Sequence, residues 1–316
     1  MSLLRFKSLN GRLTQAILAL LGASILIWVI MPLAPGNPAR RILQAQGIVE
    51  PTDLEIEEMH ELLHLDKPLW NRYLIWLSNV IRGDFGLSWQ TGEPVRQEFF
   101  KRLPATLKLA CTSFLLAALL AIPSGLLAAK WHKRWPDTIL RILSLFGAAV
   151  PSFVIALLFI HFMIIALGWG DVILDGNMNQ VWIPALVLAI DIVATWSRLL
   201  RASLLETKGQ PFILSAATRG ASENRILLRH AFPNASIPLL HAMGMTLGSL
   251  LGGTVIIETI FTWPGLGRYV IEAITARDLP IIQAYAFFST VCFVAMSFLV
   301  DVVSWLIDPR IGHRWK

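Results

Sequence analysis

The sequence carries little charge for its length. Asp, Glu, Lys and Arg supply 15% of its 316 residues, against roughly 25% in an ordinary soluble domain. It also has only two cysteines, Cys111 and Cys292, and both lie within apolar stretches. Two isolated cysteines exclude a disulfide framework and a cysteine-based metal cluster. The chain is therefore neither a typical soluble domain nor a disulfide-stabilised one.

Hydrophobic residues supply 55% of the chain and are gathered in blocks. A helix needs about 20 mainly apolar residues to cross the roughly 30 Å hydrocarbon layer of a bilayer. Because backbone amides inside lipid must be satisfied within the segment, each block of that length is predicted to be a helix. We predict an all-α membrane protein with about six transmembrane helices. They span approximately residues 13–31, 104–129, 139–167, 182–200, 235–257 and 283–307.

The net charge of +6 reflects orientation in the membrane. Lys and Arg gather on one side of the six-helix path, whereas residues 168–181 on the other side contain none. By the positive-inside rule, both termini are therefore cytoplasmic. This distribution gives no reason to expect a nucleic-acid partner. The basic residues on the cytoplasmic side include Arg5, Lys7, Arg12, Lys130, Lys133, Arg134, Arg201, Lys208, Arg219, Arg225, Arg229, Arg310, Arg314 and Lys316.

The predicted helices divide the chain into four parts. Residues 1–31 form the cytoplasmic N-terminus and first transmembrane helix, and 32–103 form a long external segment with helices at the membrane interface. Residues 104–307 form a five-helix core that includes a cytoplasmic segment, 208–233. Residues 308–316 form a cytoplasmic tail.

Two local patterns refine this division. In the external segment, Thr52 or Asp53 is predicted to cap a short acidic helix. In the fifth predicted span, Gly244, Gly248 and Gly252 recur every four residues along one face. This spacing predicts close approach of another helix backbone, with a wide spot beside a pathway as the alternative.

The cytoplasmic segment 208–233 is too polar to cross the membrane and reads KGQPFILSAATRGASENRILLRHAFP. Pro211 suits a first helical turn, and a short helix over Phe212–Arg219 can end at Gly220 in a left-handed conformation. Ser222 is then predicted to cap a second short helix. The unit predicts a rigid handle for a cytoplasmic partner, and the alternative is an ordinary basic surface loop.

This segment resembles the cytoplasmic coupling motif of ABC importer permeases. The motif reads Glu-Ala-Ala, three residues, Gly, nine residues, and Ile-x-Leu-Pro. Gly220 matches the glycine, Ala216 the second alanine and Pro233 the final proline, whereas Leu214 and Ser215 replace the glutamate and first alanine. The resemblance implies that ATPase coupling involves Ala216, Arg219, Gly220, Arg225, His230 and Pro233.

Further stretches resemble the dipeptide, oligopeptide and nickel group of binding-protein-dependent permeases. They lie at 83–88, 94–95, 103–106, 198–203, 261–268 and 308–310, so the likeness covers nearly the whole chain. It implies a bacterial inner-membrane permease that forms half of a translocation pathway, without enzymatic activity of its own. The implied partners are a second related permease, making a heterodimer, two ATPase subunits and a periplasmic solute-binding protein.

No cofactor is expected in this chain. It lacks the phosphate-binding pattern Gly-x-x-x-x-Gly-Lys-Ser/Thr, so ATP and Mg²⁺ would be bound by the partner ATPases. The general likeness to nickel-type permeases suggests nickel or a metal–chelator complex as the substrate. Import of a di- or oligopeptide by the same mechanism remains the alternative, since selectivity is expected to reside largely in the binding protein.

Several polar residues within predicted membrane helices are candidates for the pathway. Asp191 lies near the middle of the fourth helix, where a carboxylate costs about 2.5–3.5 kcal/mol on insertion scales. Thr195 follows one turn later, and Glu258 lies where the fifth helix leaves the membrane. The alternatives are a hydrogen bond between helices for Asp191 and a cap on the following turn for Glu258.

Three residues offer contacts to a soft cation. His161 in the third predicted helix, with His241 and Met245 on one face of the fifth, supply imidazole nitrogens and a thioether. Methionine on an apolar helix is more often core filler. These residues are therefore candidate metal contacts, with a packing role as the alternative.

Two other classes of function remain to be weighed. His60-Glu61-Leu62-Leu63-His64 fits the zinc-protease pattern His-Glu-x-x-His, in which the two histidines share a helix face and Glu61 would act as general base. A secondary transporter or channel working alone, with Asp191 as its cation site, is the other possibility. Inverted internal repeats would support that second class, and the sequence shows none.

Overall fold

The computed structural model describes residues 2–33, 37–45, 47–168 and 180–307, and none of these residues lies in a strand. The N-terminal helices are α1 (Ser2–Leu33), α2 (Pro38–Ala45), α3 (Asp53–Leu62) and α4 (Leu69–Ile81). They are followed by α5 (Val95–Lys130), α6 (Trp135–Ala149), α7 (Ser152–Phe159), the π-helix η1 (Ile160–Ala166) and α8 (Trp182–Lys208). The remainder comprises α9 (Pro211–Thr218), α10 (Glu223–Arg225), the π-helix η3 (Ile226–Ala231), α11 (Phe232–Gly253), α12 (Val255–Ile260), α13 (Leu266–Ala276) and α14 (Leu279–Ile307).

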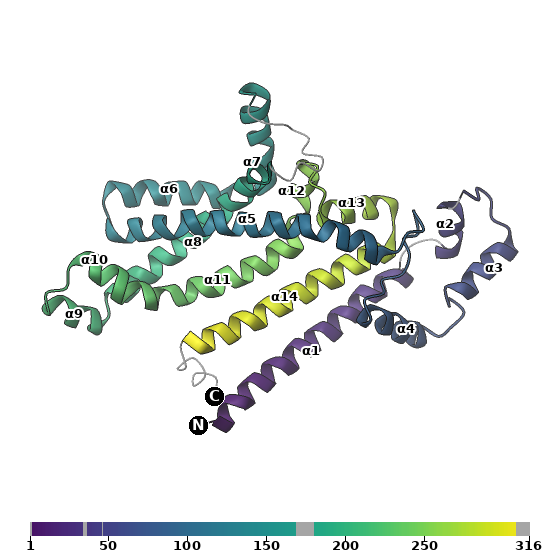
Figure 1. Ribbon diagram of the computed structural model, residues 1–316, viewed down its shortest axis with the longest axis horizontal. Coiled ribbons are helices and arrows are strands. Elements are labelled where there is room, and N and C mark those ends of the chain that lie inside the picture. The colour runs from purple at the N-terminus through teal and green to yellow at the C-terminus, as the bar shows by residue number, and fades with distance from the viewer. Residues whose placement is uncertain (1, 34–36, 46, 169–179, 308–316) are drawn as a thin grey trace.

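Five of the described helical stretches are long and apolar enough to cross a membrane: Leu13–Ile30, Val95–Lys130, Trp182–Lys208, Glu223–Gly253 and Leu279–Val300. A sixth candidate is a broken pair, α6 with the helix that follows it, bent by 100°. The prediction of an all-α protein with about six spans is thus confirmed. The long helices run side by side along the length of the molecule (Figure 1).

The predicted third span, 139–167, is wrong as a continuous helix. α6 ends at Ala149, and Val150 adopts an extended backbone with φ −93° and ψ 122°. The physical reason is Pro151, because a proline disfavours helical geometry in the residue before it. α7 then turns away from the bundle (Figure 1).

The predicted second span also begins earlier than expected. α5 starts at Val95, so the expected boundary between residues 103 and 104 falls inside a helix. Val95 and Phe99 are buried and join a cluster that contains Leu266 from α13. The beginning of α5 is thus held by packing at its outer end, which a hydropathy pattern does not register.

Small residues bring α5 and α8 together at the centre of the core. Ala110, Ala117 and Ala121 of α5 are buried in the same cluster as Leu200 of α8. A Cβ added at Gly125 would lie 3.0 Å from the Leu200 Cβ. Such close approach is how membrane helices gain van der Waals contact without a hydrophobic driving force between them.

The glycines of α11 serve packing, as their spacing predicts. A Cβ added at Gly244 would lie 1.7 Å from Val300 Cγ2, and one at Gly252 would lie 3.0 Å from Ser289 Cβ. Both neighbours belong to α14. The wide-spot alternative is therefore not needed for these two positions.

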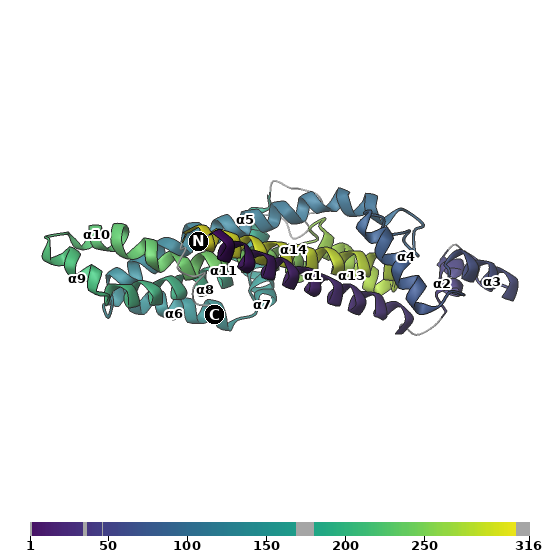
Figure 2. The ribbon, with the colours of Figure 1, turned by 90° about the horizontal axis from the view of Figure 1, so that it is seen from below.

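The two ends of the bundle carry different elements. α9 and α10 lie at the end that also holds the start of α1 and the end of α14, whereas α2, α3 and α13 lie at the opposite end (Figures 1 and 2). This arrangement agrees with a cytoplasmic segment 208–233 and an external segment 32–103. The predicted tail, 308–316, and most of the connection 168–181 lie outside the described residues.

At the external end, the predicted acidic helix is confirmed. Thr52 caps α3, with its backbone N–H donating to Glu55 Oε2 at 2.8 Å and the Glu55 N–H donating to Thr52 Oγ1 at 3.4 Å. α4 is tied to α1 by a hydrogen bond of 2.8 Å between Tyr73 and Ser24. The external segment is therefore connected to the first span.

Candidate functional site

The first half of the predicted handle is a short helix that ends at a glycine. Pro211 occupies the first turn of α9, where its missing N–H is not required. Gly220 follows with φ +79°. The Gly220 N–H donates to the Ala217 carbonyl at 3.0 Å, and the Ala221 N–H donates to the Ala216 carbonyl at 3.2 Å. These two bonds form a Schellman cap, so the predicted break at Gly220 is confirmed.

The second half differs from the separate short helix that was predicted. α10, η3 and α11 follow one another without interruption, so a single helical stretch runs from Glu223 to Gly253. Ser222 precedes it with extended backbone but makes no side-chain capping hydrogen bond. The widened turns of η3 come directly before Pro233, which lies in the first turn of α11. A proline lacks an amide hydrogen, and a widened turn is one way a helix adjusts to it.

The handle is anchored to the bundle by apolar and polar contacts. Ile213 of α9 and Leu227 of η3 are both buried in the main core cluster. The Lys208 ammonium donates to the Ala129 carbonyl at 3.1 Å and lies 3.9 Å from Glu223. The buried side chain of Ile213 therefore packs α9 into the core, while Lys208 at the end of α8 contacts both α5 and α10.

Between the two halves lies an open hollow of about 550 Å³. It brings together five of the six residues predicted for coupling, and only Pro233 is not part of its lining. Phe212 stands at its edge with 45% of its surface exposed. The surface thus combines positive charge with exposed apolar area. The lining comprises Phe212, Ser215, Ala216, Arg219, Gly220, Ala221, Arg225 and His230.

Glu258 lies at the other end of the core and is fully buried. Its Oε1 accepts hydrogen bonds from Thr106 Oγ1 at 2.9 Å and Thr254 Oγ1 at 2.7 Å. Its Oε2 accepts the backbone N–H groups of Gly267 at 2.7 Å and Arg268 at 3.1 Å. This carboxylate therefore joins α5, α12 and α13. That matches the turn-capping alternative and differs from the predicted lining of an external mouth.

Asp191 and Thr195 lie on one exposed face of α8. Arg198 continues this face one turn later and donates from Nε to the Ala194 carbonyl at 3.1 Å. Spacings of four and three residues place the three side chains above one another along the helix. Asp191 makes no helix-to-helix hydrogen bond among the described residues, so the alternative role predicted for it is not seen.

The candidate metal contacts are not gathered into a ligand set. His161 lies in η1, where its ring contacts Phe162, whereas His241 and Met245 lie in α11. Among the described residues, no three His, Cys, Asp or Glu side chains form a group suited to a metal ion.

The zinc-protease pattern at His60 is contradicted by the local backbone. α3 ends at Leu62, and His64 has φ +55°. The two histidines therefore do not share a helix face, which chelation at a four-residue spacing requires. His60 Nε2 lies 2.9 Å from Asn37 Oδ1. The hypothesis of a metalloprotease is wrong.

Two ion or hydrogen-bond centres escaped the sequence analysis. Asp137 of α6 accepts from Arg201 of α8 at 2.6 and 2.8 Å and joins the cytoplasmic ends of these helices. At the external end, Asp278 accepts from Ser88 Oγ at 2.5 Å and from the Trp89 N–H at 3.2 Å.

Near Asp278, burial raises the pKa of the Tyr269 hydroxyl to about 12, so this hydroxyl stays protonated. The sequence does show Asp137 and Asp278 as acidic residues beside apolar runs. It does not show their partners, which lie far away along the chain.

Comparison with known families gives matches along almost the whole chain. The family described as binding-protein-dependent transport system inner membrane component matches residues 121–313. The N-terminal family of binding-protein-dependent transport system membrane components matches residues 3–110.

Curated relatives cover nearly the full length. The glutathione transport system permease protein GsiC of Escherichia coli (strain K12) is 33% identical over 303 residues, covering 96% of this chain and 98% of the relative. GsiC of Shigella flexneri serotype 5b (strain 8401) is 32% identical over the same share of both chains.

Solved structures share the fold. The MetNI methionine ABC transporter, in an inward-facing conformation, matches with a TM-score of 0.54 and 16% identity, over 68% of this chain and 99% of the other. An amino acid ABC transporter with histidines matches with a TM-score of 0.51 and 19% identity, over 68% and 94%. The family matches and the curated relatives, rather than these structures, exclude a secondary transporter or channel that works alone. The chain belongs to the binding-protein-dependent family of inner-membrane transport components, as a multi-pass permease subunit of a bacterial ABC importer whose ATPase activity lies in separate subunits.

Proposed function

We propose that a partner ATPase subunit binds this permease at the hollow between α9 and α10. The observation that carries the proposal is the convergence of Ala216, Arg219, Gly220, Arg225 and His230 on one cytoplasmic surface. Exposed apolar side chains beside positive charge suit an acidic partner surface with an apolar centre. Pro233, at the start of α11, transmits the force into the membrane helix.

The rigidity of this handle is what allows it to work as a transmitter. Moving a two-state equilibrium from 1:99 to 99:1 needs about 5.5 kcal/mol of differential binding. A flexible loop would lose that free energy in its own rearrangement. Here the Schellman cap at Gly220 and the buried side chain of Ile213 fix α9 against the bundle.

A photo-crosslinking experiment tests this docking. A photoreactive phenylalanine analogue replaces Phe212 in the assembled transporter, and irradiation is expected to join the permease to the ATPase subunit. The matched control carries the same analogue at Trp70, which is 66% exposed but lies on α4 at the external end. Equal crosslinking from both positions, or none from position 212, would contradict the proposal.

We further propose that the exposed face of α8 lines the translocation pathway in the assembled pore. A carboxylate within a membrane helix is costly unless it faces water or a partner, and Asp191 hydrogen-bonds to no other helix in the described part of this chain. The pathway would then lie between this permease and a second, related one in a heterodimer. Asp191 and Thr195 are its proposed lining, whereas Glu258 is assigned to the structure of the outer end.

For the substrate we propose a short peptide rather than nickel. The relatives compared above carry glutathione in their names, and glutathione is a tripeptide. Among the described residues, no three His, Cys, Asp or Glu side chains form a group suited to a cation, so the structure adds no support for nickel or a metal–chelator complex. His161, His241 and Met245 are accordingly assigned to packing.

Calorimetry on the partner binding protein distinguishes these substrates. Glutathione and unmodified di- and tripeptides are titrated beside Ni²⁺ and a nickel–histidine complex. Heat of binding with a peptide alone supports the proposal. Saturable binding of a nickel species with no response to peptides would overturn it.

A further inference from the structure

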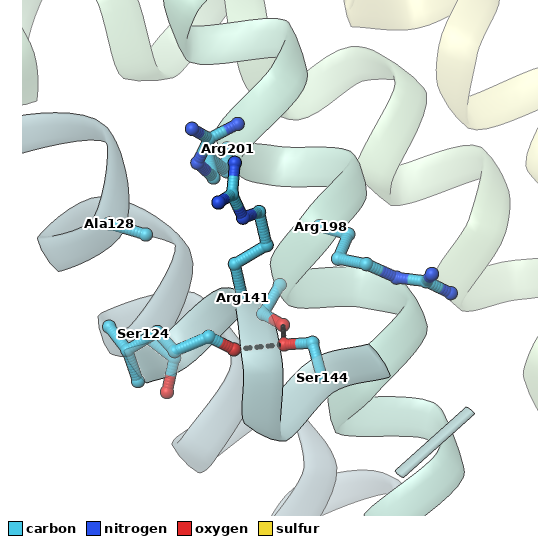
Figure 3. Close-up of a pocket in the computed structure, with 8 residues that line it drawn as sticks. Ser124, Ala128, Arg141, Ser144, Arg198 and Arg201 are labelled. Carbon is cyan, nitrogen blue, oxygen red and sulfur yellow. Dashed lines mark hydrogen bonds between the residues drawn. The ribbon is translucent and has the colours of Figure 1, made fainter. Parts of the chain in front are cut away.

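A small pocket between α5, α6 and α8 carries three arginines. Its volume is about 150 Å³, and its polar lining comprises Ser124, Arg141, Ser144, Ser197, Arg198 and Arg201. In Figure 3 the Arg141 side chain extends from α6 toward the end of the pocket where Arg201 lies, whereas Arg198 extends to the other side. This pocket lies apart from the handle described above.

The charges of the pocket are not balanced. Arg201 is held by Asp137 through two hydrogen bonds of 2.6 and 2.8 Å. Arg141 is exposed and makes no hydrogen bond or ion pair with the described part of the chain. Asp137 thus pairs with Arg201, whereas Arg198 extends to the other side of the pocket (Figure 3). The pocket therefore keeps an excess of positive charge. Arg201 is held in place by Asp137, whereas Arg141 is available to bind an anion.

The pocket lies at the level of the cytoplasmic headgroups. His132 and Lys133 stand beside Asp137, in the connection that the positive-inside rule assigns to the cytoplasm. Trp135 is 75% exposed, and tryptophan favours the membrane interface. Arg141 follows it by about 9 Å along α6, at 1.5 Å per residue, and its long side chain can return toward the interface.

The surface below the pocket is apolar. On α6, Leu145 lies one turn after Arg141 on the same face and is 61% exposed. A ligand with a negatively charged head and a hydrocarbon tail would fit this surface, with its head at the arginines and its tail along the exposed apolar side chains. A soluble anion would use only the upper part.

We propose that this pocket holds the phosphate group of an anionic phospholipid from the cytoplasmic leaflet. Guanidinium groups bind phosphate through paired N–H donors. Basic pockets between membrane helices on the cytoplasmic side bind lipid headgroups of this charge. The occupied site would link α6 to α8 at the end where the handle begins.

Native mass spectrometry of the assembled transporter tests the proposal. The delipidated complex is titrated with phosphatidylglycerol or phosphatidylcholine, without ATP, so the readout does not depend on the coupling role. Tighter binding of phosphatidylglycerol is expected, and Arg141→Gln should weaken it about fivefold, since one basic residue contributes about that factor. Arg141→Lys should restore part of the affinity, because the charge is kept while the paired donors are lost.

The matched control is Arg134→Gln. Arg134 is exposed at the same end of α6 but does not line the pocket, so its loss should leave phosphatidylglycerol binding unchanged. Equal weakening by both variants would show a general charge effect and overturn the site. No weakening by Arg141→Gln in an assembled complex would do the same. Displacement of the lipid by excess inorganic phosphate would assign the pocket to a soluble anion and contradict the lipid proposal.

Discussion

At the outer end of the bundle, a single carboxylate accepts hydrogen bonds from four donors and joins three helices. Glu258 accepts two hydroxyl groups and two backbone amides while fully buried. A buried donor without a partner costs about 1–3 kcal/mol. The stability of this end therefore depends on a residue whose position in the sequence suggested a transport role.

Replacement of Glu258 is expected to destabilise the protein strongly. Glu258→Ala should lower the free energy of unfolding by at least about 2 kcal/mol, because the amides of Gly267 and Arg268 lose their acceptor. Glu258→Gln should lose less, since it keeps one acceptor oxygen. Thermal unfolding of the purified complex measures the difference.

Glu272→Ala is the control for this prediction. Glu272 lies on α13 and pairs with Arg268 at 2.9 Å, but it is exposed. Exposed pairs contribute about 0–1 kcal/mol, so the unfolding temperature should hardly change. Similar losses for Glu258→Ala and Glu272→Ala would refute the role of the buried carboxylate.

Asp191 allows a functional prediction at the same scale. Asp191→Ala should reduce solute uptake into proteoliposomes while the complex still assembles, because the exposed side chain makes no hydrogen bond to another helix among the described residues. Glu206→Ala, another exposed acidic residue of α8 near its cytoplasmic end, should leave uptake unchanged. A parallel loss of uptake and assembly for Asp191→Ala would make this residue structural.

Single residues also show what a sequence can and cannot predict. The left-handed Gly220 and the cap at Thr52 were predicted because both depend on residue types a few positions apart. For Glu258 the sequence left a pathway role and a turn cap both open, because its partner Thr106 lies 152 residues away. The pair Asp137–Arg201 was missed for the same reason, with a separation of 64 residues.

Among the elements, α11 and α14 are held together by the glycine face of α11. Gly244→Leu should prevent this packing, because even a Cβ would lie 1.7 Å from Val300 Cγ2. The expected result is loss of folded permease, measured as the monodisperse fraction in size-exclusion chromatography. Gly253→Leu, where a Cβ meets nothing within 4 Å, should keep that fraction near the wild-type value. Good recovery of Gly244→Leu would contradict the packing.

The elements were predicted well where apolar runs are long and poorly where they are interrupted. The spans over α1, α8 and α14 follow directly from hydropathy. At Pro151 the apolar run continues while the helix breaks, since proline excludes the preceding residue from helical geometry. From residue 223 the opposite occurs. The sequence is polar, but the helix that begins at Glu223 continues without a break into the membrane helix α11. Hydropathy alone registers neither event.

At the scale of the whole molecule, the two ends of the bundle have separate tasks. The outer end is fixed by buried carboxylates, Glu258 and Asp278, whereas the cytoplasmic end presents a basic handle that is rigid within itself. Long helices connect the two ends, so displacement of the handle can tilt α11 against α8. An alternating-access importer needs this combination of a fixed outer end and a driven inner end.

We propose that the left-handed break at Gly220 delivers the free energy of ATP hydrolysis to the bundle. A Cβ at Gly220 meets nothing within 4 Å, so a substitution there acts through the backbone alone. A left-handed conformation costs roughly 1–2 kcal/mol for an ordinary residue, and asparagine tolerates it better. Gly220→Val and Gly220→Asn therefore differ in backbone strain rather than in available space.

The most direct measurement is the number of solute molecules imported per ATP hydrolysed by the complete transporter in proteoliposomes. For Gly220→Val we expect this ratio to fall several-fold while the complex stays assembled and ATP is still hydrolysed. For Gly220→Asn we expect a ratio near that of the wild type. A wild-type ratio for assembled Gly220→Val would show that coupling does not depend on the left-handed break.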